Sequence, residues 1–341
     1  MVSEVRRLAA LLLIALLAAP LASSAVRAQR KVIAIDLTPG RVKDVDKPKY
    51  QAVLNWLIGN LTAMGYEVRK LSKISRDTLK GVDALVIGKL RDERGAFKPD
   101  EVEAIAEWFK QGGKFLWVGA DSDYVEPYLN PEDTSFKAGE PNKILEAVGS
   151  HLRLEYASVE DPESNAGADY RVVSGKYNTA GEAAQITSGA PKVLFHGPTF
   201  VVGFDNGKFV PFEQVDKKYE TVTWLYATTD KGTVVSHDGV DPKATTVGQT
   251  GSFILAAVEK IKCGGMYSKV LVTGESLIGD RNIFYTKYHG VDLQGPTFVK
   301  QAFTWGLAVE KAGLPTMVYA VIAIVVVVVA VAVVLVLRRR K

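Results

Sequence analysis

Polar side chains that could do chemistry follow directly after two apolar runs of the sequence. The run 115–118 leads into Gly-Ala-Asp-Ser-Asp at 119–123, and the run 270–273 leads into Gly-Glu-Ser at 274–276. Carboxylates can act as general acids or bases, and serines can act as nucleophiles. We expect these residues to bind a ligand at the end of a sheet; they are Asp121, Ser122, Asp123, Glu275 and Ser276. The alternative is that they only cap the helix or turn that follows.

No residue meets the requirements for a catalytic nucleophile. Cys263 is the one cysteine of the chain, and it precedes Gly264-Gly265, where we expect a turn between two strands. A thiol nucleophile needs a sharp strand-to-helix turn and a histidine that takes its proton. Neither Ser122 nor Ser276 lies in a G-x-S-x-G motif, and no histidine can be assigned to them. We therefore assign no catalytic residue.

Metal and cofactor motifs are also missing from the sequence. The histidines are His151, His196, His237 and His289. None belongs to an i, i+4 pair or to H-E-x-x-H, the usual spacings of a zinc site. Asp121-x-Asp123 could hold a hard cation such as calcium, but the other ligands of an EF-hand loop are missing. No glycine-rich phosphate loop follows the first apolar run, so we expect neither a metal nor a cofactor.

The first half of the chain alternates between strand and helix patterns, and these elements must position the polar residues. The predicted strands are 31–37, 66–71, 84–87 and 114–118. Apolar residues at helical spacing predict connecting helices at 50–61 and 99–109. Short strand–helix–strand connections favour an α/β fold with a doubly wound, mostly parallel sheet. The carboxyl ends of the strands then form the ligand-binding edge of that sheet.

The second half of the chain is richer in strand signals. Residues 157–187 are polar and without sustained periodicity, which predicts a long loop or an insertion. Asp205-Asn206-Gly207 and Asp230-Lys231-Gly232 each lie between apolar segments and predict two added β-hairpins. Further strands are predicted at 252–261 and 269–273, followed by an amphipathic helix near 298–307. We expect 29–156 and 188–312 to be the two halves of one α/β domain.

Both ends of the chain carry targeting signals. Residues 1–28 have a basic start, an apolar stretch and small residues near the cleavage point, which predicts a signal peptide. Residues 317–337 are apolar without a charge, and as a helix of about 1.5 Å per residue they would span roughly 31 Å of membrane. The basic tail 338–341 should remain cytoplasmic. We expect a single-pass cell-membrane protein with its N-terminal domain outside the cell.

The charge of the chain argues against nucleic-acid binding. The formal net charge is +4, and the four cations of the tail 338–341 alone account for it. The predicted extracellular domain therefore has no basic excess for a phosphate backbone. The partners that we expect are the lipid bilayer, other membrane proteins, and a glycan or peptide ligand.

Four segments carry a family resemblance. They are V-D-A-L-V-I-G (82–88), W-F-K-Q-G-G-K-F-L-W-V-G (108–119), N-K-I-L-E-A-V-G (142–149) and K-V-L-V-T-G-E-S (269–276). Together they resemble non-catalytic relatives of class I glutamine amidotransferases. This group includes auxiliary domains of gliding-motility-type ABC transporters, intraflagellar transport proteins and the single-pass non-catalytic subunit of oligosaccharyltransferase. The resemblance implies a flavodoxin-like fold and a binding or scaffolding role.

Two functions from different classes follow from these observations. The first is a catalytically inactive, amidotransferase-like binding module that is an accessory subunit of a transporter or glycan-handling membrane complex. The second is a surface hydrolase that cleaves glycans or peptides with the carboxylates at its strand ends. A hydrolase requires these acids to converge in one cleft, with at least one shifted pKa.

Overall fold

The computed structural model describes residues 30–42, 47–90, 95–124, 136–279 and 283–313. The predicted signal peptide, membrane span and basic tail lie outside these residues. Within the described part of the chain, no helix has both the length and the apolar character that a membrane span needs.

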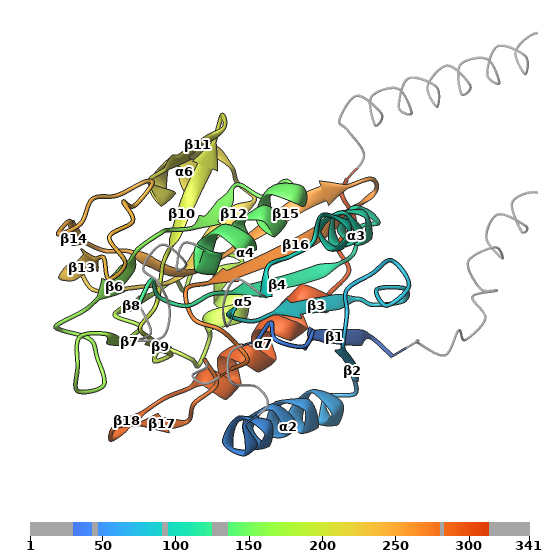
Figure 1. The fold of residues 1–341 in the computed structure, drawn as a ribbon, viewed down its shortest axis with the longest axis horizontal. Coiled ribbons are helices and arrows are strands. Elements are labelled where there is room, and N and C mark those ends of the chain that lie inside the picture. The colour runs from blue at the N-terminus through green and yellow to red at the C-terminus, as the bar shows by residue number, and fades with distance from the viewer. Residues whose placement is uncertain (1–29, 43–46, 91–94, 125–135, 280–282, 314–341) are drawn as a thin grey trace, which may run out of the picture.

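A mixed α/β fold is built around a sheet whose central strands are parallel (Figure 1). The parallel strands are β1 (Val32–Asp36), β2 (Glu67–Leu71), β3 (Ala84–Ile87), β4 (Phe115–Gly119) and β16 (Met266–Thr273). Their order across the sheet is β2, β1, β3, β4, β16. This is the 2-1-3-4-5 order of flavodoxin-like folds, with β16 as the fifth strand.

Helices cover both faces of the parallel strands (Figure 1). They are α2 (Pro48–Ala63), α3 (Pro99–Lys110), α4 (Phe136–Ala147) and α7 (Gly295–Leu307). Apolar residues of α2 and α7 belong to one core cluster, and those of α3 and α4 belong to a second cluster on the opposite face. The predicted helices at 50–61, 99–109 and 298–307 are confirmed.

Strand β4 shows how alternate side chains supply both cores. Phe115 and Trp117 point to the face of α7, where the ring of Phe115 meets that of Phe303 edge-on at 5.7 Å. Leu116 and Val118 belong to the cluster that contains α3 and α4. Because neighbouring residues of a strand point to opposite faces, a strand buried on both faces must be apolar throughout.

Antiparallel strands extend the sheet beyond β16. They are β5 (Leu152–Leu154), β8 (Lys176–Tyr177), β10 (Val201–Asp205), β11 (Lys208–Val210), β12 (Val222–Ala227) and β15 (Ile254–Cys263). The predicted hairpin at Asp205-Asn206-Gly207 is confirmed as β10–β11. Asn206 and Gly207 have φ angles of 51° and 77°, as a two-residue type I′ turn requires.

The second predicted hairpin is wrong. Strand β12 pairs with β15 and β8, whereas β13 (Gly232–Val235) pairs with β6 (Ser158–Glu160) and β14 (Thr250–Gly251) in another sheet. The turn residues are present, but burial of β12 against the long strand β15 determines its partner. Tertiary packing has therefore overridden a local turn signal.

Residues 157–187, predicted as a loop or insertion, contain secondary structure of their own. Besides β6 and β8 they form β7 (Arg171–Val173) and the short helix α5 (Ala183–Thr187). β7 pairs with β9 (Leu194–His196), and α5 packs near α7. The remaining elements are α6 (Phe212–Lys218), β17 (Lys287–Tyr288) and β18 (Val291–Asp292).

Candidate functional site

The two polar segments predicted from the sequence meet at the carboxyl edge of the parallel strands. β4 and β16 are direct neighbours, and Gly119 is paired with Thr273 at the last position of both strands. A Cβ atom on Gly119 would lie only 2.8 Å from the Cα of Ser276. The absence of a side chain at Gly119 thus allows the segments that carry Asp121 and Glu275 to pack backbone against backbone.

A buried lysine lies between the two acids. Lys89 directly follows Gly88 at the end of β3, and its Nζ atom is 3.4 Å from Oε1 of Glu275 and 3.6 Å from Oδ1 of Asp121. The three side chains are 2%, 1% and 9% exposed, respectively. Two carboxylates removed from water would repel each other strongly, and the ammonium group between them offsets that repulsion.

Backbone groups and Ser276 hold this cluster in place. Glu275 accepts hydrogen bonds from the backbone N–H of Ser276 at 2.7 Å and from that of His196 at 3.0 Å. The Ser276 hydroxyl donates to the carbonyl of Ile278 at 2.6 Å and accepts from the backbone N–H of Lys89 at 3.1 Å. A hydroxyl that is used in this way is a structural link between strand ends rather than a nucleophile.

Asp123 has a different set of partners from Asp121. Its carboxylate accepts a hydrogen bond from the Ser158 hydroxyl and one from the backbone N–H of His237, the latter at 2.7 Å. Burial raises the pKa of the Asp123 carboxyl, and these two bonds only partly oppose that change. Ser122 lies between the two acids and accepts from the backbone N–H of Tyr124 at 3.2 Å.

Among the described residues, a very small cavity adjoins Asp121 and Asp123. A cavity of about 10 Å³ is lined by residues that include Asp121, Asp123, Lys137 and Glu155. Such a volume holds about one water molecule. Asp121 and Asp123 thus line one cavity, and the pKa of Asp123 is raised, as a hydrolase requires. The cavity, however, cannot admit a sugar ring or a peptide.

The strand ends of β1 and β3, where flavodoxin-like proteins bind ligands, are closed by a second ionic group. Arg41 donates to Asp36 at 2.9 Å and to Glu101 at 2.7 Å, and all three side chains are buried. Its guanidinium also lies 4.2 Å from the centre of the Phe97 ring. Charged side chains thus occupy the switch point of the sheet.

Cys263 lies at the opposite edge of the sheet from Asp121. It is paired with Met266 at the start of the β15–β16 hairpin, confirming the predicted turn at Gly264-Gly265. Strand β16 has 8 residues, which at about 3.3 Å each separate its two ends by roughly 25 Å. In the described residues, no group of three or more His, Cys, Asp or Glu side chains could hold a metal ion.

The sequence identified part of this site and missed the rest. Asp121, Glu275 and Ser276 meet as their place after neighbouring strands suggested, whereas Asp123 turns toward Ser158. Lys89 was missed, although it follows a predicted strand just as the acids do. Its place directly after a strand was the signal that could have found it. The contacts of Ser158, His196 and His237 with the acids join distant segments, and no local sequence pattern predicts them.

The fold and this site define an α/β protein with flavodoxin-like strand order and a buried ionic cluster at the strand ends. No family model and no curated protein matches the chain. Among solved structures, the mmIFT52 N-terminal domain matches with a TM-score of 0.51 and 12% identity, over 81% of this chain and 97% of that one. A putative ThuA-like protein from Bacteroides uniformis matches with a TM-score of 0.44 and 11% identity, over 87% and 99%. The likeness to the mmIFT52 domain is one of fold alone.

Proposed function

We propose that this chain is a catalytically inactive, amidotransferase-like binding module that serves as an accessory subunit of a membrane assembly. The observation that carries the proposal is the buried ionic cluster of Lys89, Asp121 and Glu275, which lies at the strand ends where a catalytic nucleophile would be expected. Where a nucleophile would need freedom to reach a substrate, these groups are buried and bonded to one another. The thiol of Cys263 lies at the wrong edge of the sheet to replace it.

The membrane context of the proposal comes from the sequence. The predicted signal peptide at 1–28 and the predicted span at 317–337 would place the α/β domain outside the cell, tethered to the bilayer. A transporter or a glycan-handling complex is a fitting host because the sequence segments that carry the family resemblance are those of auxiliary, non-catalytic relatives. The mmIFT52 N-terminal domain has a similar fold, which fits the proposed α/β module.

The hydrolase alternative has weaker support. Its acids do converge, but Asp121 and Glu275 share Lys89, and the adjoining cavity is about 10 Å³. A carboxylate held by a buried ammonium is a poor general base, and the cavity that the described residues form beside Asp121 is too small for a substrate.

Co-purification of the full chain from native membranes tests the proposal. The tagged chain is solubilised in mild detergent, and the proteins and glycans that remain bound are identified by mass spectrometry. Residues 314–341 with the same tag are the control, because they reveal partners captured through the predicted span alone. We expect partners that require the α/β domain. A chain that elutes alone, without protein or glycan, would contradict the accessory role.

The orientation is tested separately on intact cells. Added protease should remove the α/β domain if it faces outward. A domain that is cut only after the cells are lysed would place it inside and overturn the predicted topology.

A further inference from the structure

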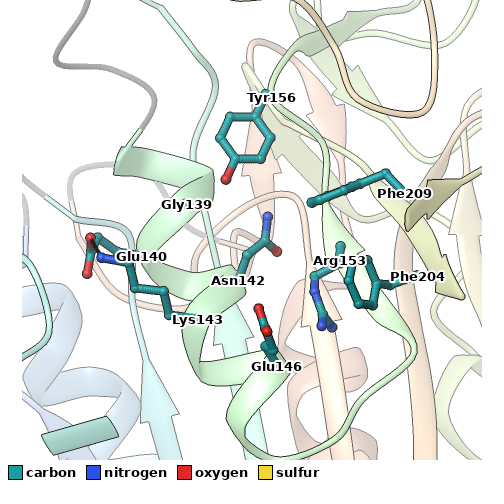
Figure 2. A pocket seen from close by; sticks show the side chains of 9 residues that line it. All are labelled: Gly139, Glu140, Asn142, Lys143, Glu146, Arg153, Tyr156, Phe204 and Phe209. Atoms are coloured by element: carbon teal, nitrogen blue, oxygen red, sulfur yellow. Dashed lines mark hydrogen bonds and ion pairs between the residues drawn. The ribbon is translucent and has the colours of Figure 1, made fainter. Parts of the chain in front are cut away.

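A groove separate from the strand-end cluster opens between α4 and the antiparallel part of the sheet (Figure 2). Its volume is about 380 Å³, within the range of pockets that hold small organic ligands. Residues of α4, including Lys143 and Glu146, form one side. Arg153 of β5, Tyr156, and the phenylalanines of β10 and β11 form the other.

The main polar feature of this groove is a buried cation without a carboxylate partner. Arg153 is only 2% exposed, and its Nη1 atom donates to the carbonyls of Ser150 at 2.7 Å and Leu152 at 2.9 Å. Within the described part of the chain, its Nε and Nη2 atoms donate to no protein acceptor, and no acid lies within 4.0 Å of the guanidinium. Buried charges in proteins are ordinarily paired, so this arrangement leaves donors for an incoming anion.

Neither of the two nearby acids forms an ion pair with Arg153. Glu259 attracts Arg153 through space, and its carboxylate accepts hydrogen bonds from the Ser150 hydroxyl at 2.7 Å and from the backbone N–H of His151 at 2.8 Å. Glu146 is exposed on α4 at the mouth of the groove. Both attract Arg153 through space, but burial is the larger effect and lowers its pKa to about 10. The guanidinium therefore remains charged at neutral pH.

Aromatic rings line the groove beside Arg153. The guanidinium lies 4.1 Å from the centre of the Phe204 ring, which meets Phe209 edge-on at 5.5 Å. Tyr156 meets Phe209 in the same manner at 6.0 Å. These partly exposed rings offer apolar surface next to a hydrogen-bonding cation, a combination that suits a compact ring with one acidic substituent.

We propose that this groove binds a carboxylate-bearing sugar, with the carboxylate on Arg153 and the C–H face of the ring on Phe204 and Phe209. A carboxylate can accept two parallel hydrogen bonds from the free side of a guanidinium, and the low exposure of Arg153 strengthens them. The Tyr156 side chain lines the same groove and offers its hydroxyl to the sugar hydroxyls. The inference names a ligand class for the proposed binding module, and it stands independently of any membrane partner.

Calorimetric titration of the full chain in detergent tests the ligand class. The probes are glucuronate, the neutral methyl glucoside, and N-acetylphenylalanine as a carboxylate on a peptide-like body. We expect saturable binding of glucuronate and at least about tenfold weaker binding of the neutral sugar, since charge-assisted hydrogen bonds are lost. Equal binding of the neutral sugar would overturn the role of Arg153. Tighter binding of N-acetylphenylalanine would contradict the assignment of a sugar as the ligand. Absence of glucuronate binding would contradict the proposal that the groove is a binding site.

Two substitutions test the geometry. Arg153→Met should weaken glucuronate binding at least about tenfold. Because Arg153 also holds two carbonyls, this variant can lose stability, so Glu146→Gln provides a second test at an exposed position. Removing the competing acid should tighten glucuronate binding by about two- to fivefold at low salt, and the gain should fade as salt is added. Glu67→Gln, the same change on β2 at the far edge of the sheet, is the control. An unchanged or weaker affinity in Glu146→Gln would contradict the proposal.

Discussion

Lys89 and Glu275 are 186 positions apart in the sequence, yet their charged groups meet at 3.4 Å beneath the carboxyl ends of β3 and β16. Asp121 completes the group from β4, the strand between them. Three neighbouring parallel strands thus each contribute one charged residue to a single buried cluster. This cluster occupies the edge of the sheet at which related folds bind their ligands.

Replacing Lys89 with methionine should destabilise the protein strongly. Lys89→Met would remove the ammonium group that the buried Asp121 and Glu275 share, and loss of one member of a buried ionic group costs about 3–5 kcal/mol. The measurement is the free energy of unfolding in urea.

Lys176→Met is the matched control for this experiment. Lys176 pairs with Asp230 on the surface, with 40% and 77% exposed side chains, so its removal should cost about 1 kcal/mol or less. The combined variant Lys89→Met, Asp121→Asn, Glu275→Gln should recover part of the loss. Equal costs for the two lysines would show that the cluster contributes no more than a surface pair.

Asp123 should make the stability fall as the pH rises. Its pKa in the native state lies above the ordinary value of 3.8 because of burial, so between these two pKa values the native state binds more protons than the unfolded state. The free energy of unfolding therefore decreases through this window, and the loss is complete above the native pKa. The difference in stability between wild type and Asp123→Asn, measured from about pH 4 to 8, isolates this contribution. Parallel stability curves would exclude it.

Gly119→Ala should force apart the segments that follow β4 and β16 and that carry Asp121 and Glu275. The new Cβ atom would lie 2.8 Å from the Cα of Ser276, and overpacking of this kind costs about 1–3 kcal/mol. Gly59 is the control because it lies within α2 with no atom within 4 Å of the corresponding position. Gly59→Ala should stabilise the protein by about 0.5–1 kcal/mol through helix propensity. A tolerated Gly119→Ala would mean that the backbones at the site can separate freely.

The thiol of Cys263 should be dispensable for binding. It is 8% exposed at the β15–β16 turn, at the other end of β16 from the strand-end cluster, and it does not line the groove. Cys263→Ser should cost about 1 kcal/mol of stability and leave partner capture unchanged. Iodoacetamide should modify the native thiol at least roughly tenfold more slowly than the unfolded one, because buried thiols react through opening of the fold. Loss of bound partners in the folded variant would give the thiol a role that its position does not suggest.

The parallel half of the fold was predictable because its signals are local. Val32–Asp36 and Ala84–Ile87 are apolar throughout, and the helix at Pro99 begins with acids in its first turn. The hairpin at Asn206-Gly207 followed from the φ angles that its turn demands. The partner of β12 could not be predicted in this way, because pairing with β15 depends on side-chain packing between distant segments.

By itself, the sequence determined the alternation of strands and helices, the turn at Cys263, the absence of catalytic and metal motifs, and the expectation of a membrane-bound ectodomain. Only the tertiary structure decided that Lys89 joins Asp121 and Glu275, that Asp123 turns to Ser158, and that Arg153 faces an aromatic groove. The physical reason is the distance along the sequence over which each kind of interaction acts. Periodicity and turn chemistry act over a few residues, whereas the pairing of buried charges depends on which strand ends the fold brings together.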